Sequence, residues 1–129
     1  MAAAERYVGK LYGTLVMAAL SLREKEFPTA TVWLVGSALH KVERPRDVDV
    51  RVVLPDDDFE RRFGFGFDEW CGQRLEWPRS PEFEAYMDLR DRVERFFVYA
   101  CGERMMDVSV IPERIFALHQ DDPKERLAP

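Results

Sequence analysis

An apolar run at residues 31–35 ends in Gly36-Ser37, and a second apolar run begins with Asp47-Val48-Asp49 and continues to Leu54. Both runs have the length and the β-branched content of strands. Side chains alternate between the two faces of a strand, so Asp47 and Asp49 share one face while the valines point to the other. Two carboxylates held this close repel each other unless a cation lies between them. The sequence therefore predicts a cation site at the start of the second strand.

A third apolar run, at about residues 104–111, has a single carboxylate, Asp107, in its middle. If this strand lies beside the second one, the carboxylates of Asp47, Asp49 and Asp107 converge. Hard oxygen ligands in that number suit Mg²⁺ or Mn²⁺, which leave their other positions to water and substrate phosphates. We therefore predict that these three residues hold a metal, and that a nucleoside triphosphate completes the site.

The strand that ends in Gly36-Ser37, the Asp-x-Asp of the next strand and the later Asp107 together resemble the nucleotidyltransferase superfamily typified by DNA polymerase beta. By length the chain is most like the minimal nucleotidyltransferases, and the resemblance covers about residues 31–111. It implies an α/β (α+β) fold in which a small mixed β-sheet is flanked by helices. It also implies an enzyme that transfers a nucleoside monophosphate from a triphosphate such as ATP to a hydroxyl of a small-molecule or protein acceptor, with release of pyrophosphate. Asp47, Asp49 and Asp107 are then the catalytic residues.

Four further residues are expected to contact the nucleotide: Gly36, Ser37, Arg46 and Arg51. Gly36 has no Cβ, so a phosphate can approach its backbone. The Ser37 hydroxyl can donate to a terminal phosphate, beside the free N–H groups of the helical turn expected after it. Arg51 shares a strand face with the aspartates, and pairing with them is favoured over contact with a phosphate. Arg46 precedes the first aspartate on a loop, where it either grips the triphosphate or stays solvated.

A second interpretation belongs to a different class of protein. The residues that follow Ser37 differ from the usual family pattern, which is compatible with a catalytically weak nucleotidyltransferase-fold module. Such a module would bind a nucleotide or regulate a partner, as an antitoxin does. A third interpretation, an antibiotic-modifying transferase, requires an acidic pocket for a cationic drug; residues 56–58 are all aspartate, but a solvated loop is the simpler expectation for them.

Composition limits the partners. The 129 residues carry 24 acidic and 19 basic side chains, a net charge of −5, which makes nucleic acid an unlikely partner because its backbone repels an acidic surface. The sequence has neither a signal-peptide pattern nor an apolar run near the length of a membrane span, so we expect a cytoplasmic chain without a membrane partner. The two cysteines are far apart and suggest neither a zinc site nor a disulfide framework. The acceptor is then recognised by residues 59–81, by a homodimer partner or by another protein.

The rest of the chain reads as one domain, residues 1–129. Apolar residues at spacings of three and four predict a packing helix over about residues 3–25. Ser80 and Pro81 predict the start of a second long helix and Gly102 its end. Residues 59–81 are expected to form a long irregular connection with one short helix, and their aromatic residues a satellite core. Residues 112–119 predict a short helix, and the tail at residues 120–129 is expected to be loose.

Overall fold

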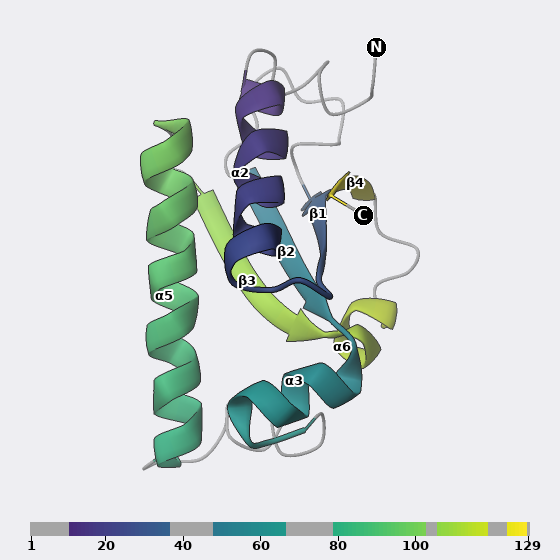
Figure 1. Cartoon of the computed structure of the whole chain (residues 1–129), viewed down its shortest axis with the longest axis vertical. Coiled ribbons are helices and arrows are strands. Elements are labelled where there is room, and N and C mark those ends of the chain that lie inside the picture. The colour runs from purple at the N-terminus through teal and green to yellow at the C-terminus, as the bar shows by residue number, and fades with distance from the viewer. Residues whose placement is uncertain (1–10, 37–47, 67–78, 103–105, 119–123, 129) are drawn as a thin grey trace.

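The computed structural model describes residues 11–36, 48–66, 79–102, 106–118 and 124–128. These residues form four helices and a four-stranded mixed sheet, with helices flanking the sheet, which confirms the predicted α+β class (Figure 1). In chain order the elements are α2 (Leu11–Lys25), β1 (Thr31–Val35), β2 (Val48–Leu54), α3 (Asp56–Phe63), α5 (Pro81–Cys101), β3 (Met106–Pro112), α6 (Glu113–Ala117) and β4 (Lys124–Ala128). No helix among them is long and apolar enough to cross a membrane.

The sheet has the strand order β3-β2-β1-β4. β1 pairs with β2 and with β4 in the antiparallel direction, whereas β2 and β3 are parallel. Parallel neighbours need a long crossover connection, and here that connection contains α3 and α5. In Figure 1, α5 runs alongside β3 and α2 lies across the sheet. β2 is therefore an interior strand with β1 on one side and β3 on the other.

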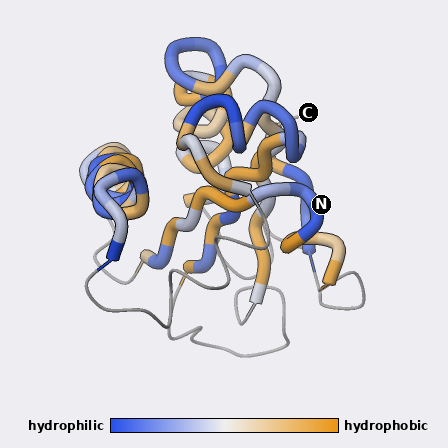
Figure 2. The backbone as a smooth tube through the Cα atoms, turned by 90° about the horizontal axis from the view of Figure 1, so that it is seen from below, coloured by the Kyte–Doolittle hydropathy of each residue, from blue (hydrophilic) through white to orange (hydrophobic). Residues whose placement is uncertain are grey.

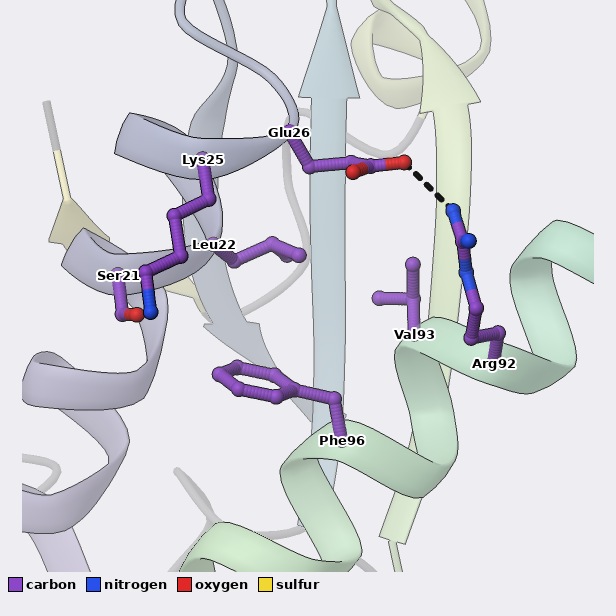
Figure 3. Close-up of a pocket in the computed structure, with 7 residues that line it drawn as sticks. All are labelled: Ser21, Leu22, Lys25, Glu26, Arg92, Val93 and Phe96. Atoms are coloured by element: carbon purple, nitrogen blue, oxygen red, sulfur yellow. Dashed lines mark hydrogen bonds and ion pairs between the residues drawn. The ribbon is translucent and has the colours of Figure 1, made fainter.

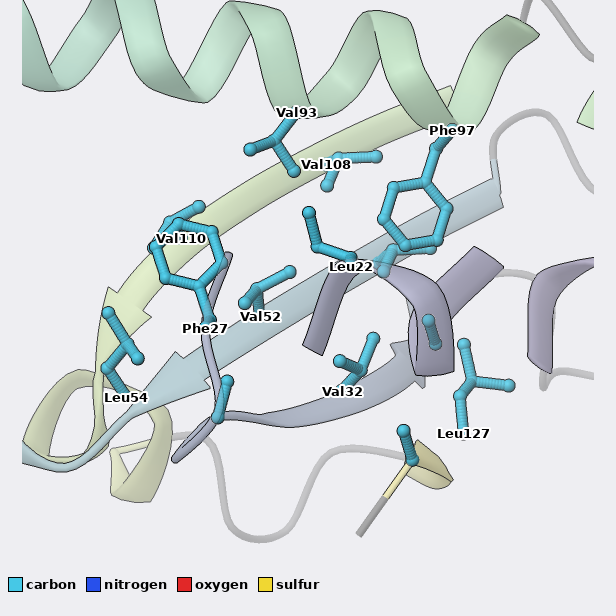
Figure 4. Packing of buried hydrophobic residues seen from close by; sticks show 14 of the residues in the cluster. Leu22, Phe27, Val32, Val52, Leu54, Val93, Phe97, Val108, Val110 and Leu127 are labelled. Atoms are coloured by element: carbon cyan, nitrogen blue, oxygen red, sulfur yellow. The ribbon is translucent and has the colours of Figure 1, made fainter. Parts of the chain in front are cut away.

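The main core lies between the sheet and the two long helices (Figure 4). Alternate residues of each strand point into it, such as Val50 and Val52 of β2 and Val108 and Val110 of β3, all with 0% exposure. The same alternation gives strands that change between hydrophobic and hydrophilic along their length (Figure 2). α6 contributes to a smaller cluster on the opposite face of the sheet, in which Ile115 lies with Val53 and Ile111. The remainder of that opposite face is left to polar side chains.

The predicted boundaries of the long helices agree with the structure where it describes them. α2 ends at Lys25, before Phe27-Pro28, as predicted, while the predicted start at residues 3–10 lies outside the described residues. α5 begins after Ser80, whose Oγ accepts a hydrogen bond from the Phe83 N–H at 3.1 Å. It ends before Gly102, which takes the left-handed conformation at φ 66°. Both caps satisfy backbone groups that a helix end leaves without partners.

Replacing Ser80 with alanine removes the side-chain acceptor at the start of α5. We expect Ser80→Ala to lower the free energy of unfolding by about 1 kcal/mol, because the Phe83 N–H loses its partner within the protein. Urea unfolding followed by circular dichroism measures this change, and Ser80→Asp, which keeps an acceptor, serves as the control. Equal stabilities for the alanine and aspartate variants would contradict a capping role.

The aromatic residues of the connection after β2 form part of the main core. Phe59, Phe63 and Phe65 are buried and contact Phe83 and Tyr86 of α5, with ring centroids 4.7–6.4 Å apart. The Tyr86 hydroxyl donates to the backbone carbonyl of Val110 on β3. The expectation of a separate satellite core was therefore wrong for these residues. The aromatics fill the space between α3, α5 and the sheet, and so fix where α5 lies against β3.

The acidic run after β2 is helical. Residues 56–58 were expected to form a solvated loop, but they are the first turn of α3. Negative side chains are favourable at a helix N-terminus because they face the positive end of the helix dipole. The carboxylate of Asp56 also accepts from the backbone N–H of Arg114 at 3.0 Å, and Asp58 pairs with Arg61 at 3.0 Å. These contacts leave no acidic drug pocket in this turn.

The chain tail is also more ordered than predicted. Residues 124–128 form β4, which pairs with β1 and buries Leu127 and Ala128. Without β4, the backbone groups on one side of β1 would lack strand partners. Only two apolar residues enter the core from β4, so the periodic signal in the sequence was too short to predict a strand.

Candidate functional site

Asp49 of β2 and Asp107 of β3 are direct neighbours across the parallel pair. Both belong to the strand face opposite the main core, since Val50 and Val108 beside them are fully buried. Adjacent strands lie about 4.8 Å apart, so the two aspartates come from backbone positions at that separation. The predicted adjacency of the second and third strands is thus confirmed, and with it the pairing of two of the three predicted carboxylates.

Gly36 closes the site on the side of β1. It follows Val35, the register partner of Asp49, and has φ 75°, a conformation that residues with a Cβ rarely adopt. A Cβ built on Gly36 would lie 2.4 Å from Oδ2 of Asp49, closer than real atoms approach. The Asp49 carboxylate therefore lies directly against the Gly36 backbone. The sequence predicted a close approach at this glycine by a phosphate, and the group found there is the protein's own carboxylate.

Two arginines hold the Asp107 carboxylate. Arg90 of α5 donates from Nη2 to Oδ1 at 2.9 Å, and Nη2 of Arg51 lies 3.8 Å from Oδ2. The pairing role favoured for Arg51 is confirmed by this ion pair. The Asp107 side chain still keeps 45% exposure, so solvent or a ligand reaches it.

Arg90 is a feature that the sequence interpretation missed. Burial disfavours its charged form, but the carboxylates of Glu94, Asp91 and Asp107 outweigh that effect and raise the pKa of Arg90 above its ordinary value. Its positive charge is therefore permanent. Glu94, one turn further along α5, accepts a hydrogen bond from the Val108 N–H at 3.3 Å, which caps the free edge of β3. The signal for both residues was a polar i, i+4 pair on a helix, which becomes informative only once α5 is known to run along β3.

The described carboxylates fit a magnesium ion that takes one or two protein ligands and completes its shell with water and phosphate oxygens. Asp49 and Asp107 supply two hard oxygen donors on neighbouring strands. Within the described residues no cluster of three His, Cys, Asp or Glu side chains is present. The third predicted ligand, Asp47, lies outside the described residues, as do the predicted nucleotide contacts Ser37 and Arg46.

A cavity on the opposite, helical side of the sheet does not share these residues. It has a volume of about 220 Å³ and lies between the end of α2 and α5, with Leu22, Val93 and Phe96 in its wall (Figure 3). The carboxylate at its rim, Glu26, is bound by Arg92 at 2.6 Å and by Arg62 at 2.7 Å. Its charge is thus balanced within the protein, and the acidic pair on the open face is the better candidate for a cation site.

The chain matches no family model, no curated protein and no solved structure.

Removing Arg90 tests the contacts around Asp107. We expect Arg90→Gln to lower the free energy of unfolding by about 1 kcal/mol at low salt and by less at 1 M salt, because the lost ion pairs are partly exposed and screened. Chemical unfolding at the two salt concentrations provides the measurement. Arg95→Gln, at an exposed position on the same helix, is the matched control. A loss equal to that of the control would contradict a specific role for Arg90.

Proposed function

We propose that the chain is a metal-dependent nucleotidyltransferase that transfers a nucleoside monophosphate from a nucleoside triphosphate to a hydroxyl, with release of pyrophosphate. The observation that carries this proposal is the register of Asp49 with Asp107 on one open strand face, next to the strand end at Gly36. Phosphoryl transfer needs little covalent chemistry from a protein, because positioning and charge stabilisation supply most of the rate enhancement. A pair of carboxylates that recruits a cation meets that need.

Each residue of the site has a role in this proposal. Asp49 and Asp107 bind Mg²⁺ or Mn²⁺, and Asp47 is the proposed third ligand. The bound metal neutralises phosphate charge and lowers the pKa of an attacking oxygen. Arg51, which lies between the acidic pair and the rest of the open face, neutralises Asp107 before the nucleotide binds and a phosphate oxygen afterwards.

Ser37 and Arg46 remain proposed contacts of the triphosphate. The acceptor is a small molecule or a protein, and a homodimer partner or another chain helps to recognise it. The proposed location is the cytoplasm, where nucleoside triphosphates are available. The acidic net charge of −5 favours such acceptors over nucleic acid.

A second candidate function is a nucleotide-binding or antitoxin-like regulatory module with little turnover. The specific observation that favours it is the double engagement of Asp107, whose two oxygens face Arg90 and Arg51. Two guanidinium groups supply positive charge where a metal would otherwise bind. A metal that binds at Asp107 must therefore compete with them, which lowers its affinity.

Calorimetric titration distinguishes the two candidates. ATP, GTP, CTP and UTP are titrated into the protein with Mg²⁺, with Mn²⁺ and with EDTA, and pyrophosphate release is followed in parallel. Metal-dependent binding with pyrophosphate release supports the transferase. Binding without pyrophosphate release, even when hydroxyl acceptors are supplied, supports the module. No binding under any of these conditions by a folded protein overturns the proposal of a transferase.

A further inference from the structure

The open face of the sheet has a second feature beyond the acidic pair. A cavity of about 310 Å³ lies where α6 crosses this face, a volume typical of small-molecule sites. Its lining comes from β1, β2, β4 and α6 and includes Thr31, Trp33, Val53, Glu113, Phe116 and Arg126. Neither the metal ligands nor the proposed phosphate contacts account for these residues.

The walls of the cavity are aromatic. The rings of Trp33 and Phe116 have centroids 5.2 Å apart with an interplanar angle of 38°. The Trp33 indole is fixed by a hydrogen bond from its Nε1 to the Thr31 hydroxyl at 2.9 Å. The guanidinium of Arg126 lies over the same indole, 5.8 Å from the ring centroid. A rigid indole held in this way offers a surface on which a flat ring binds at low entropic cost.

Polar groups of both kinds surround these rings. Arg126 supplies donors, while the carboxylate of Glu113 supplies acceptors. A heteroaromatic ring with ring nitrogens and exocyclic groups matches this combination, whereas a purely aliphatic ligand leaves both charged groups without partners. The lining therefore fits a nucleobase by shape and by hydrogen-bonding chemistry.

The cavity lies on the same face as the acidic pair and within reach of it. Trp33 is the register partner of Arg51, which is two residues along β2 from Asp49. Two residues of a strand span roughly 7 Å, so the indole starts about that distance from the acidic pair along the strand direction. Arg51 lies between the two, at the position where the sugar and first phosphate of an extended nucleotide would pass.

We propose that this cavity binds the base of the nucleoside triphosphate, with Trp33 and Phe116 against the ring. The inference rests on the proposed function, since it places the triphosphate at Asp49 and Asp107. It divides the open face into a metal–phosphate part and a base part. The two parts are separately testable because inorganic tripolyphosphate occupies only the first.

The experiment compares Mg·ATP with Mg·tripolyphosphate by calorimetry on the wild type, Trp33→Leu and Ala117→Phe. Ala117 is an exposed residue of the cavity wall, so a phenylalanine there adds bulk to the cavity without disturbing the core. For the wild type we expect ATP to bind at least about 10-fold more tightly than tripolyphosphate, the size of a base–aromatic contact. Both variants are expected to lose that advantage and to bind tripolyphosphate as the wild type does.

The outcomes separate this inference from the proposed function. If the wild type binds both ligands equally, or if ATP keeps its advantage in both variants, the base does not lie in this cavity, while the metal–phosphate part stands. If Trp33→Leu does not fold, Ala117→Phe decides the question alone. If tripolyphosphate does not bind, or binds equally with Asp49→Asn, the proposed function fails first and the inference fails with it.

Discussion

Asp49→Asn is expected to reduce the affinity for Mg·ATP by at least about 100-fold, because a direct ligand contributes no less than the outer-shell groups whose loss costs 10–100-fold in metal affinity. Pyrophosphate release is expected to fall by roughly 10²–10³-fold or more, the loss typical of removing one preorganised electrostatic contact. Asparagine has the shape of aspartate, so the strand and its pairing with β3 remain. Calorimetry and a pyrophosphate assay provide the two measurements.

The stability of the same variant is an independent check. Asp49 and Asp107 are adjacent carboxylates, so removing one charge relieves repulsion, and we expect the free energy of unfolding to fall by no more than about 1 kcal/mol. Asp88→Asn makes the same chemical change at an exposed position on α5 and is expected to alter neither property. Unchanged nucleotide affinity in folded Asp49→Asn would show that the acidic pair is not the metal site.

Gly36→Ala is expected to damage both the fold and the site. The positive φ of 75° costs an alanine about 1–2 kcal/mol. The new Cβ also meets Oδ2 of Asp49 at 2.4 Å, so either the carboxylate or the end of β1 must move. We expect the free energy of unfolding to fall by about 2 kcal/mol or more and nucleotide affinity to fall with it. Urea unfolding and calorimetry on the same preparation measure both.

Two other glycines separate the causes. Gly102 also has a positive φ, 66°, but a Cβ there meets nothing within 4 Å, so Gly102→Ala shows the conformational cost alone. Gly13 lies inside α2 with open space around it, and Gly13→Ala is expected to stabilise the helix by about 0.5–1 kcal/mol. If Gly36→Ala cost no more than Gly102→Ala, the close approach of Asp49 to Gly36 would be wrong.

The sequence predicted most of the framework that carries the site. Its boundaries for β1 and for the start and end of α5 agree with the structure, because alternating valines and a Ser-Pro start with a glycine end are local signals. The register that places Asp49 beside Asp107 also agrees with the prediction, although it depended on strand adjacency that no local pattern specifies.

The misses have a common physical origin in contacts between distant parts of the chain. β4 became a strand because β1 provides a pairing edge, and Phe59 joined the core because α5 brings Tyr86 to it. Arg90 entered the site only because α5 runs along the edge of β3. None of these neighbours is visible in the local sequence, so periodicity and capping rules had no signal to use.

The parallel pairing of β2 with β3 also couples ligand binding to folding. The acidic pair is made by two strands joined through α3 and α5, and the unfolded chain has no equivalent of it. A ligand that bridges Asp49 and Asp107 therefore binds the native state alone, and mass action converts its binding free energy into thermal stability. Closing so long a loop is slow compared with forming a helix, so the site should be among the last parts of the molecule to appear during refolding.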